Sequence, residues 1–217
     1  MNPAGKYEYM ITDMGYRYGS DASKTVGILI ANPDKTFVKD EILNNIEYAN
    51  SRSGLSIDFF FAGYSKYDTY DEQQKIIKAP KGKDWYFSVK MFTDFIEQLE
   101  QKSRWEYSGE TELLLLEFKN GNLCFDKVMH IWIDKVVQEE SVYSASYLFE
   151  NIYRIARKKM NTDTDEFSDR LGIRNVRNSF FDIMLGFLNE AIRDAIRSTS
   201  IYAVKNYSIS CLQNVVE

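Results

Sequence analysis

The sequence is poor in the residues that most often carry chemistry or covalent structure. Its 217 residues include two cysteines, one histidine and three prolines. Cys124 and Cys211 lie 87 positions apart, and thiols this sparse exclude a disulfide framework and a thiolate metal site. A single histidine, His130, does not assemble a zinc site without ligands from elsewhere, and we expect it to be structural. We therefore assign no metal, no cofactor and no catalytic residue from the sequence.

Long apolar runs are also absent. No segment approaches the roughly 18 consecutive apolar residues that a membrane-spanning helix needs. The first nine residues, Met1–Tyr9, lack the apolar core of a secretory signal. With 44% hydrophobic residues the chain can nevertheless bury a substantial core. These features predict a cytoplasmic globular protein that does not enter a membrane.

Positive charge is scarce over most of the chain. Residues 1–150 contain 17 Lys and Arg against 24 Asp and Glu, whereas residues 151–217 contain 10 against 8. An acidic body repels a polyphosphate, so binding of nucleic acid would depend on the C-terminal arginines, among them Arg170, Arg174 and Arg177. Local ion pairs, such as Glu166 with Arg170 one helical turn apart, explain these arginines more simply.

What the chain does contain is an ordered series of apolar segments. The continuous run 25–31 and the run 55–62, with its three phenylalanines, are typical of strands covered on both faces. Between them an apolar stripe at helical spacing begins after Thr36, a plausible helix N-cap, and ends at Gly54. The pattern predicts a right-handed βαβ unit. The tyrosine-rich segment 7–12 is expected to add an edge strand.

A second set of elements follows. Residues 88–102 predict an amphipathic helix, and the segments 112–118 and 123–133 predict a hairpin joined at Asn120-Gly121. Residues 144–159 have apolar positions at helical spacing and predict the last helix of this unit.

The resulting order, βαβ-α-ββ-α over residues 25–159, resembles the thioredoxin-like fold. In particular, the segment Leu-Leu-Leu-Glu-Phe-Lys-Asn-Gly at 114–121 is similar to the hairpin of that family. We expect an α/β protein with a thioredoxin-like domain over residues 1–160 and a helical extension over 161–217. The family's redox motif lies between the first strand and its helix, where this chain has Asn32–Phe37 and no thiol. At the position of the family's cis-proline it has Glu110-Thr111. The resemblance therefore implies a redox-inactive scaffold.

The sequence of the extension, residues 161–217, predicts a helix that docks on another surface. Phe180, Met184 and Phe187 belong to a wide apolar stripe at helical spacing. Such a stripe packs on the sheet of its own chain, or it contacts a protein partner or a second copy of this chain.

The polar segment 63–84 is the second candidate interface. It carries Tyr64, Tyr67 and Tyr70 at a spacing of three, and exposed tyrosines are common in protein interfaces. The alternative is that these rings fold back over the strand ends.

Three hypotheses about function follow. The first is a redox-inactive, thioredoxin-like binding and assembly module within a cytoplasmic multi-protein complex. The second is an enzyme or sensor on a Rossmann-like sheet that binds a nucleotide or phosphorylated small molecule at Lys35 and Thr36, although no glycine-rich phosphate loop is present. The third is a nucleic-acid-associated factor that uses the C-terminal arginines.

Overall fold

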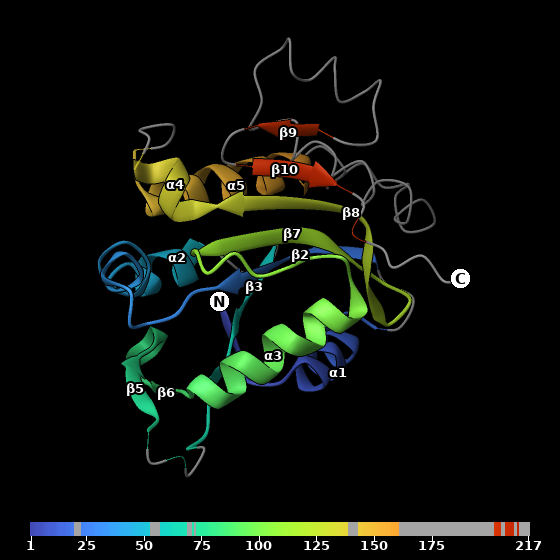
Figure 1. The fold of residues 1–217 in the computed structure, drawn as a ribbon. Coiled ribbons are helices and arrows are strands. Elements are labelled where there is room, and N and C mark those ends of the chain that lie inside the picture. The colour runs from blue at the N-terminus through green and yellow to red at the C-terminus, as the bar shows by residue number, and fades with distance from the viewer. Residues whose placement is uncertain are drawn as a thin grey trace.

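The computed structural model describes residues 1–19, 23–52, 57–68, 71, 73–138, 143–160, 202–204, 207–210 and 212. Within them, a mixed seven-stranded sheet of order β1-β3-β2-β7-β8-β10-β9 carries helices on both faces, and a three-stranded sheet of order β4-β6-β5 lies at one end (Figure 1). The predicted α/β class is confirmed. The elements in chain order are β1 (Asn2–Ala4), α1 (Tyr7–Tyr18), β2 (Ser23–Ile30), the π-helix η1 (Val38–Leu43), α2 (Ile46–Arg52), β3 (Asp58–Ala62), β4 (Tyr64–Ser65), β5 (Lys75–Lys78), the 3-10 helix η2 (Pro80–Gly82), β6 (Asp84–Phe87), α3 (Val89–Lys102), β7 (Glu112–Lys119), β8 (Asn122–Trp132), α4 (Ile133–Gln138), α5 (Ala145–Met160), β9 (Tyr202–Val204) and β10 (Tyr207–Ser210).

Strand β2 lies at the centre of the large sheet. It pairs in parallel with β3, from Val26 opposite Asp58 to Leu29 opposite Phe61. On its other side it pairs antiparallel with β7 over its whole length. Nearly all of its side chains are buried, as its continuous apolar run predicts for a strand that is covered on both faces.

The predicted hairpin is confirmed. Its turn residues, Asn120 and Gly121, have φ of 51° and 75°, the left-handed conformation that a two-residue hairpin turn requires. The register between β7 and β8 shifts between Leu115 and Glu117, so a β-bulge accommodates the run of four leucines.

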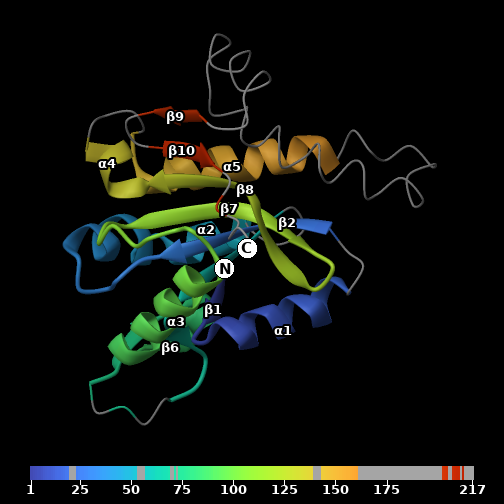
Figure 2. The ribbon, with the colours of Figure 1, turned by 45° about the vertical axis from the view of Figure 1, so that its right-hand side comes forward.

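Helices cover the two faces of the sheet in two groups. Figures 1 and 2 show α1 and α3 together on one face, with α5 on the opposite face. The rings of Tyr7 in α1 and Phe95 in α3 meet edge to face, with centroids 5.9 Å apart. On the other face Phe59 in β3 contacts Phe149 in α5 at 5.2 Å. The core therefore forms two aromatic-rich layers, one on either side of β2 and β3.

The edge strand predicted at 7–12 is wrong, because these residues form the first turns of α1. Tyr7, Met10 and Met14 are buried along one face of this helix, and their spacing follows the helical period rather than strand alternation. The edge of the sheet is instead β1, which pairs in parallel with β3.

The helix predicted to begin after Thr36 is interrupted. The segment Val38–Leu43 is π-helical and α2 begins at Ile46, after a turn at Asn44 and Asn45. The amide of Asn45 donates to the carbonyls of Asp40 and Glu41. Asparagine competes for backbone partners in this way, which accounts for the break. Thr36 is itself already helical, and Phe37 is the residue that precedes the π-helical segment, so the predicted cap at Thr36 is wrong.

The segment 63–84 holds more structure than its polar sequence suggests. Strands β4, β5 and β6 pair antiparallel into the small sheet, with Tyr64 opposite Phe87 and Ile77 opposite Trp85. At the far end of the chain β10 pairs with β8 and β9 pairs with β10. These two strands fall within the predicted extension 161–217, whereas its predicted helix around 180–197 lies outside the described residues.

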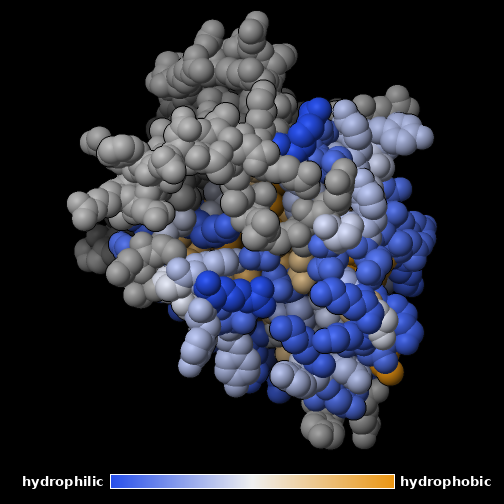
Figure 3. All heavy atoms as spheres, turned by 180° about the vertical axis from the view of Figure 1, so that it is seen from behind, coloured by the Kyte–Doolittle hydropathy of each residue, from blue (hydrophilic) through white to orange (hydrophobic). Residues whose placement is uncertain are grey.

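One face of the molecule is mostly polar where described residues form it (Figure 3). Seen from behind, it is largely hydrophilic where described residues cover it, with small apolar areas between them (Figure 3). Among the helices that the structure describes, none is both long enough and apolar enough to span a bilayer.

Gly63, between β3 and β4, provides a test of the fold. Its φ is 80°, and a Cβ there would lie 2.6 Å from the Cα of Phe92 at the start of α3. Gly82 also has a positive φ, 67°, but no neighbouring atom would contact its Cβ. We expect Gly82→Ala to cost about 1–2 kcal/mol, the usual penalty of the left-handed region. Gly63→Ala should cost about 1–3 kcal/mol more because of overpacking.

Urea denaturation of both variants measures the difference. Equal losses of unfolding free energy would contradict the close approach of α3 to this turn.

Candidate functional site

The turn after β2 lies at the end of the sheet where the first predicted ligand site was expected. Asn32 shapes this turn by accepting hydrogen bonds from Asp34 N to its side chain, at 2.9 Å, and from Lys35 N to its carbonyl. The ammonium of Lys35 lies 3.2 Å from Glu110 Oε2 and 3.7 Å from Asp134 Oδ2. Lys35 is therefore neutralised by two carboxyl groups and does not face an anion with an unpaired charge.

Glu110 and Asp134 form a carboxyl pair beside Lys35. Burial raises the pKa of Asp134, and its hydrogen bond to Glu110 raises it further. The pKa of Glu110 is lowered by the hydrogen bond from Asp134 and by the Lys35 ammonium. The two carboxyl groups therefore have pKa values shifted in opposite directions, and Asp134 Oδ2 also accepts from Thr111 N at 3.1 Å. We call Lys35, Glu110 and Asp134 the closing cluster.

A second polar network lies next to it on the α3 face of the sheet. Glu112 at the start of β7 is fully buried, and its Oε2 is 2.7 Å from His130 Nε2 and 2.9 Å from Trp105 Nε1. Its Oε1 accepts from the backbone N of Ser108 at 2.9 Å and from the Ser108 hydroxyl. The ring of His130 packs against Trp132, with centroids 4.0 Å apart. The expected structural role of His130 agrees with these contacts.

The charge of Glu112 is stabilised inside the protein. Burial acts to raise the pKa of Glu112, but the hydrogen bonds from His130 and Ser108 outweigh burial and hold the pKa below its ordinary value. Ser108 and His130 both contact this carboxylate rather than each other. The geometry therefore does not pair a serine nucleophile with a histidine base, which a catalytic triad needs. The described residues contain no group of three or more His, Cys, Asp and Glu side chains that could hold a metal ion.

The predicted interface residues lie in different environments in the structure. Tyr64 is fully buried, and its hydroxyl donates to the carbonyl of Ala31 at 2.8 Å. Its ring packs against Phe87 at 5.0 Å, so Tyr64 belongs to the core rather than to a surface that a partner contacts. Tyr67 is 78% exposed. The remaining predicted residues lie outside the described part of the chain: Tyr70, Arg170, Arg174, Arg177, Phe180, Met184 and Phe187.

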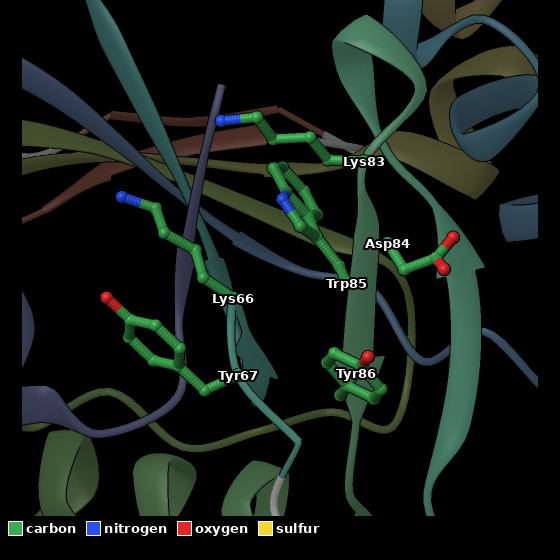
Figure 4. A pocket seen from close by; sticks show the side chains of 6 residues that line it. All are labelled: Lys66, Tyr67, Lys83, Asp84, Trp85 and Tyr86. Atoms are coloured by element: carbon green, nitrogen blue, oxygen red, sulfur yellow. The ribbon is translucent and has the colours of Figure 1, made fainter.

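A groove of about 530 Å³ lies on the small sheet, lined by Lys66, Tyr67, Lys83, Asp84, Trp85 and Tyr86 (Figure 4). This groove is not predicted from the sequence, although Tyr67 is one of the predicted interface residues. The signal was Asp84-Trp-Tyr-Phe87, a run of aromatic residues after Gly82 that is typical of a strand. Pairing of this strand with residues 64–65 brings Lys66, which follows them, close to Trp85.

Comparison with known proteins gives no match to a family model, a curated protein or a solved structure. The functional argument therefore depends on the residues of this chain.

The buried carboxylate of Glu112 predicts a pH-dependent contribution to stability. Because its pKa is lowered in the folded state, its stabilisation is present above the unfolded value of about 4.3 and is lost as the pH falls below it. We expect Glu112→Gln to lower the unfolding free energy by about 1–3 kcal/mol at pH 7, because buried donors lose a charged acceptor. The deficit should be smaller at pH 3 than at pH 7, because the stabilisation is lost as the pH falls through the lowered folded pKa.

Urea denaturation at both pH values checks this prediction. Glu106→Gln is the matched control because Glu106 is exposed nearby. A deficit that is the same at both pH values would show that the charge of Glu112 does not matter.

Proposed function

We propose that this chain is a redox-inactive, thioredoxin-like binding module that works by protein contact within a larger complex. The order β3-β2-β7-β8 supports the fold, because a parallel βαβ pair continues into an antiparallel hairpin. The placement of α5 and α3 on opposite faces agrees with it (Figure 1). Both features match the βαβ-α-ββ-α order that the sequence predicts.

The observation that carries the proposal is the closing cluster. In the thioredoxin-like arrangement the turn after the first strand and the segment before the hairpin hold the reactive thiols and the substrate. Here Lys35 from the turn is joined to Glu110 and Asp134 from the other side. These ion pairs occupy the place where exchange chemistry would occur, and they satisfy each other. This arrangement supports a function that depends on binding through another surface.

Tyrosines at the α2–α5 junction supply a surface of the kind that protein partners contact. Tyr48 of α2 is 50% exposed and Tyr147 of α5 is 53% exposed. The Tyr48 hydroxyl lies 3.4 Å from Glu150 Oε2, one helical turn after Tyr147, so the two rings belong to the same surface. Tyr143, just before α5, is 92% exposed. Tyrosine supplies large contact area at low entropic cost.

Hydrogen bonds hold the start of α5 at the α2–α5 junction, which suits a docking surface. Glu41 Oε2 accepts from Ala145 N at 3.1 Å, which fixes the start of α5 against η1. Ser144 caps the same helix by accepting from Tyr147 N at 3.1 Å. A partner that binds here therefore pays little for ordering the backbone. The predicted helix with Phe180, Met184 and Phe187 follows α5 in the chain and is proposed as a further contact with a partner or a second copy.

The first test concerns the excluded chemistry. Cys124 lies in β8 opposite Glu117, and burial together with Asp126 and Glu117 raises the pKa of its thiol, which disfavours the reactive thiolate. We expect no turnover in an insulin-reduction assay. Activity that Cys124→Ser abolishes would contradict a redox-inactive role.

The second test concerns the docking surface. A photoactivatable benzophenone amino acid at position 147 should give one discrete crosslinked product in cells that produce the full chain. The same group at Tyr16, which is 88% exposed on α1, is the matched control and should give none. Mass spectrometry of the product would identify the partner or a second copy. Equal products from both positions, or none from position 147, would contradict the proposed surface.

A further inference from the structure

We propose that the groove on the small sheet binds a phosphate group that is carried on a flat ring, with a nucleoside monophosphate as the simplest ligand of this class. The inference does not depend on the proposed assembly role, because the groove lies on β4 and β6 rather than at the α2–α5 junction.

The donors that line the groove are the first argument. Figure 4 shows the ammonium groups of Lys66 and Lys83, the hydroxyl of Tyr67 and the indole nitrogen of Trp85 directed to the same side of β6. Among the described residues, neither lysine has an ion-pair partner and the Trp85 indole has no hydrogen-bond acceptor. Two ammonium groups and an N–H on one side of the same groove are donors of the kind that bind the oxygen atoms of a phosphate.

The neighbouring lysines show that this lack of partners is not general on the small sheet. Lys75 pairs with Asp34, and Lys78 pairs with Asp84 at 2.7 Å. Asp84 is the acidic residue of the groove lining, and its carboxylate points away from the four donors (Figure 4). The carboxylate of the groove lining is therefore engaged by Lys78 rather than by the lysines of the groove, which favours an anionic ligand.

The aromatic residues are the second argument. Trp85 is only 5% exposed, because its ring packs edge to face on Phe61 at 5.4 Å and beside Tyr64 at 6.2 Å. It therefore presents a fixed N–H at the floor of the groove. Tyr67 is 78% exposed, and its backbone N is held by Ser65 Oγ at 3.0 Å. Its ring offers a face on which a flat ring can stack.

The volume of the groove is the third argument. About 530 Å³ falls within the range of small-molecule sites, roughly 300–1,000 Å³. This space is larger than an inorganic phosphate requires. A ligand that fills the groove therefore carries another group besides the phosphate. The exposed ring of Tyr67 favours a planar group that stacks on it.

The experiment uses isothermal titration calorimetry on the full chain with AMP, adenosine and inorganic phosphate. We expect AMP to bind more tightly than either fragment. The double variant Lys66→Gln/Lys83→Gln should weaken AMP binding about tenfold or more through the loss of two charge-assisted contacts. Tyr67→Ala should weaken AMP binding about tenfold while leaving the affinity for inorganic phosphate unchanged. Lys90→Gln, which changes an exposed lysine of α3 outside the groove lining, is the matched control and should bind AMP like the original chain.

Several results would overturn the proposal. One is the absence of AMP binding at millimolar concentration, and another is full AMP affinity in the lysine double variant. Equal affinity for AMP and inorganic phosphate would show that the flat ring of the ligand does not contribute to binding. Equal affinity for AMP and a tetraglutamate peptide would show that the groove binds any acidic group. Amide chemical shifts recorded with AMP should change around Lys66, Tyr67 and Trp85, and changes confined to another region would place the ligand elsewhere.

Discussion

The pairing of β2 with its two neighbours is the constraint on which the other parts of the structure depend. β3 and β7 both obtain their register from this strand, one in parallel and one antiparallel. Gly27 at its middle has no room for a side chain, because a Cβ would lie 2.4 Å from the ring of Phe59. The close contact allows Phe59 to reach the rings of α5. The position of α5, and with it the tyrosine surface at the α2–α5 junction, therefore follows from one small residue.

The end of the sheet next to β2 is stabilised by charge rather than by apolar packing. The closing cluster and the network around Glu112 bring three carboxyl groups, a lysine and a histidine together in a small volume. Ion pairs and hydrogen bonds make this arrangement stable, because each carboxyl group contacts a donor. The matched set leaves little for a ligand to gain here. By contrast, the lysines of the groove on the small sheet have no such partners among the described residues, so a ligand can gain more there.

Periodicity was sufficient for the long elements of this chain. The apolar runs of β2 and β3, the stripe of α3 and the Asn120-Gly121 turn each determine their element locally, so the sequence predicted them. Periodicity did not predict the parts of the structure that depend on pairing between distant segments. The strands β4, β5 and β6 are only two to four residues long, too short for periodicity to identify, and their mutual pairing stabilises them. The closing cluster was equally inaccessible, because Lys35, Glu110 and Asp134 are far apart in the chain and the fold alone brings them together.

The positions of the tryptophans have an optical consequence. All three tryptophans of the chain lie in its described part: Trp85 on the floor of the groove, Trp105 bonded to Glu112, and Trp132 against His130. Indole emission responds to the polarity and the charges around the ring. The intrinsic fluorescence of the protein therefore divides between the two polar regions of the molecule. Single-tryptophan versions of this chain would observe each region separately without an attached dye.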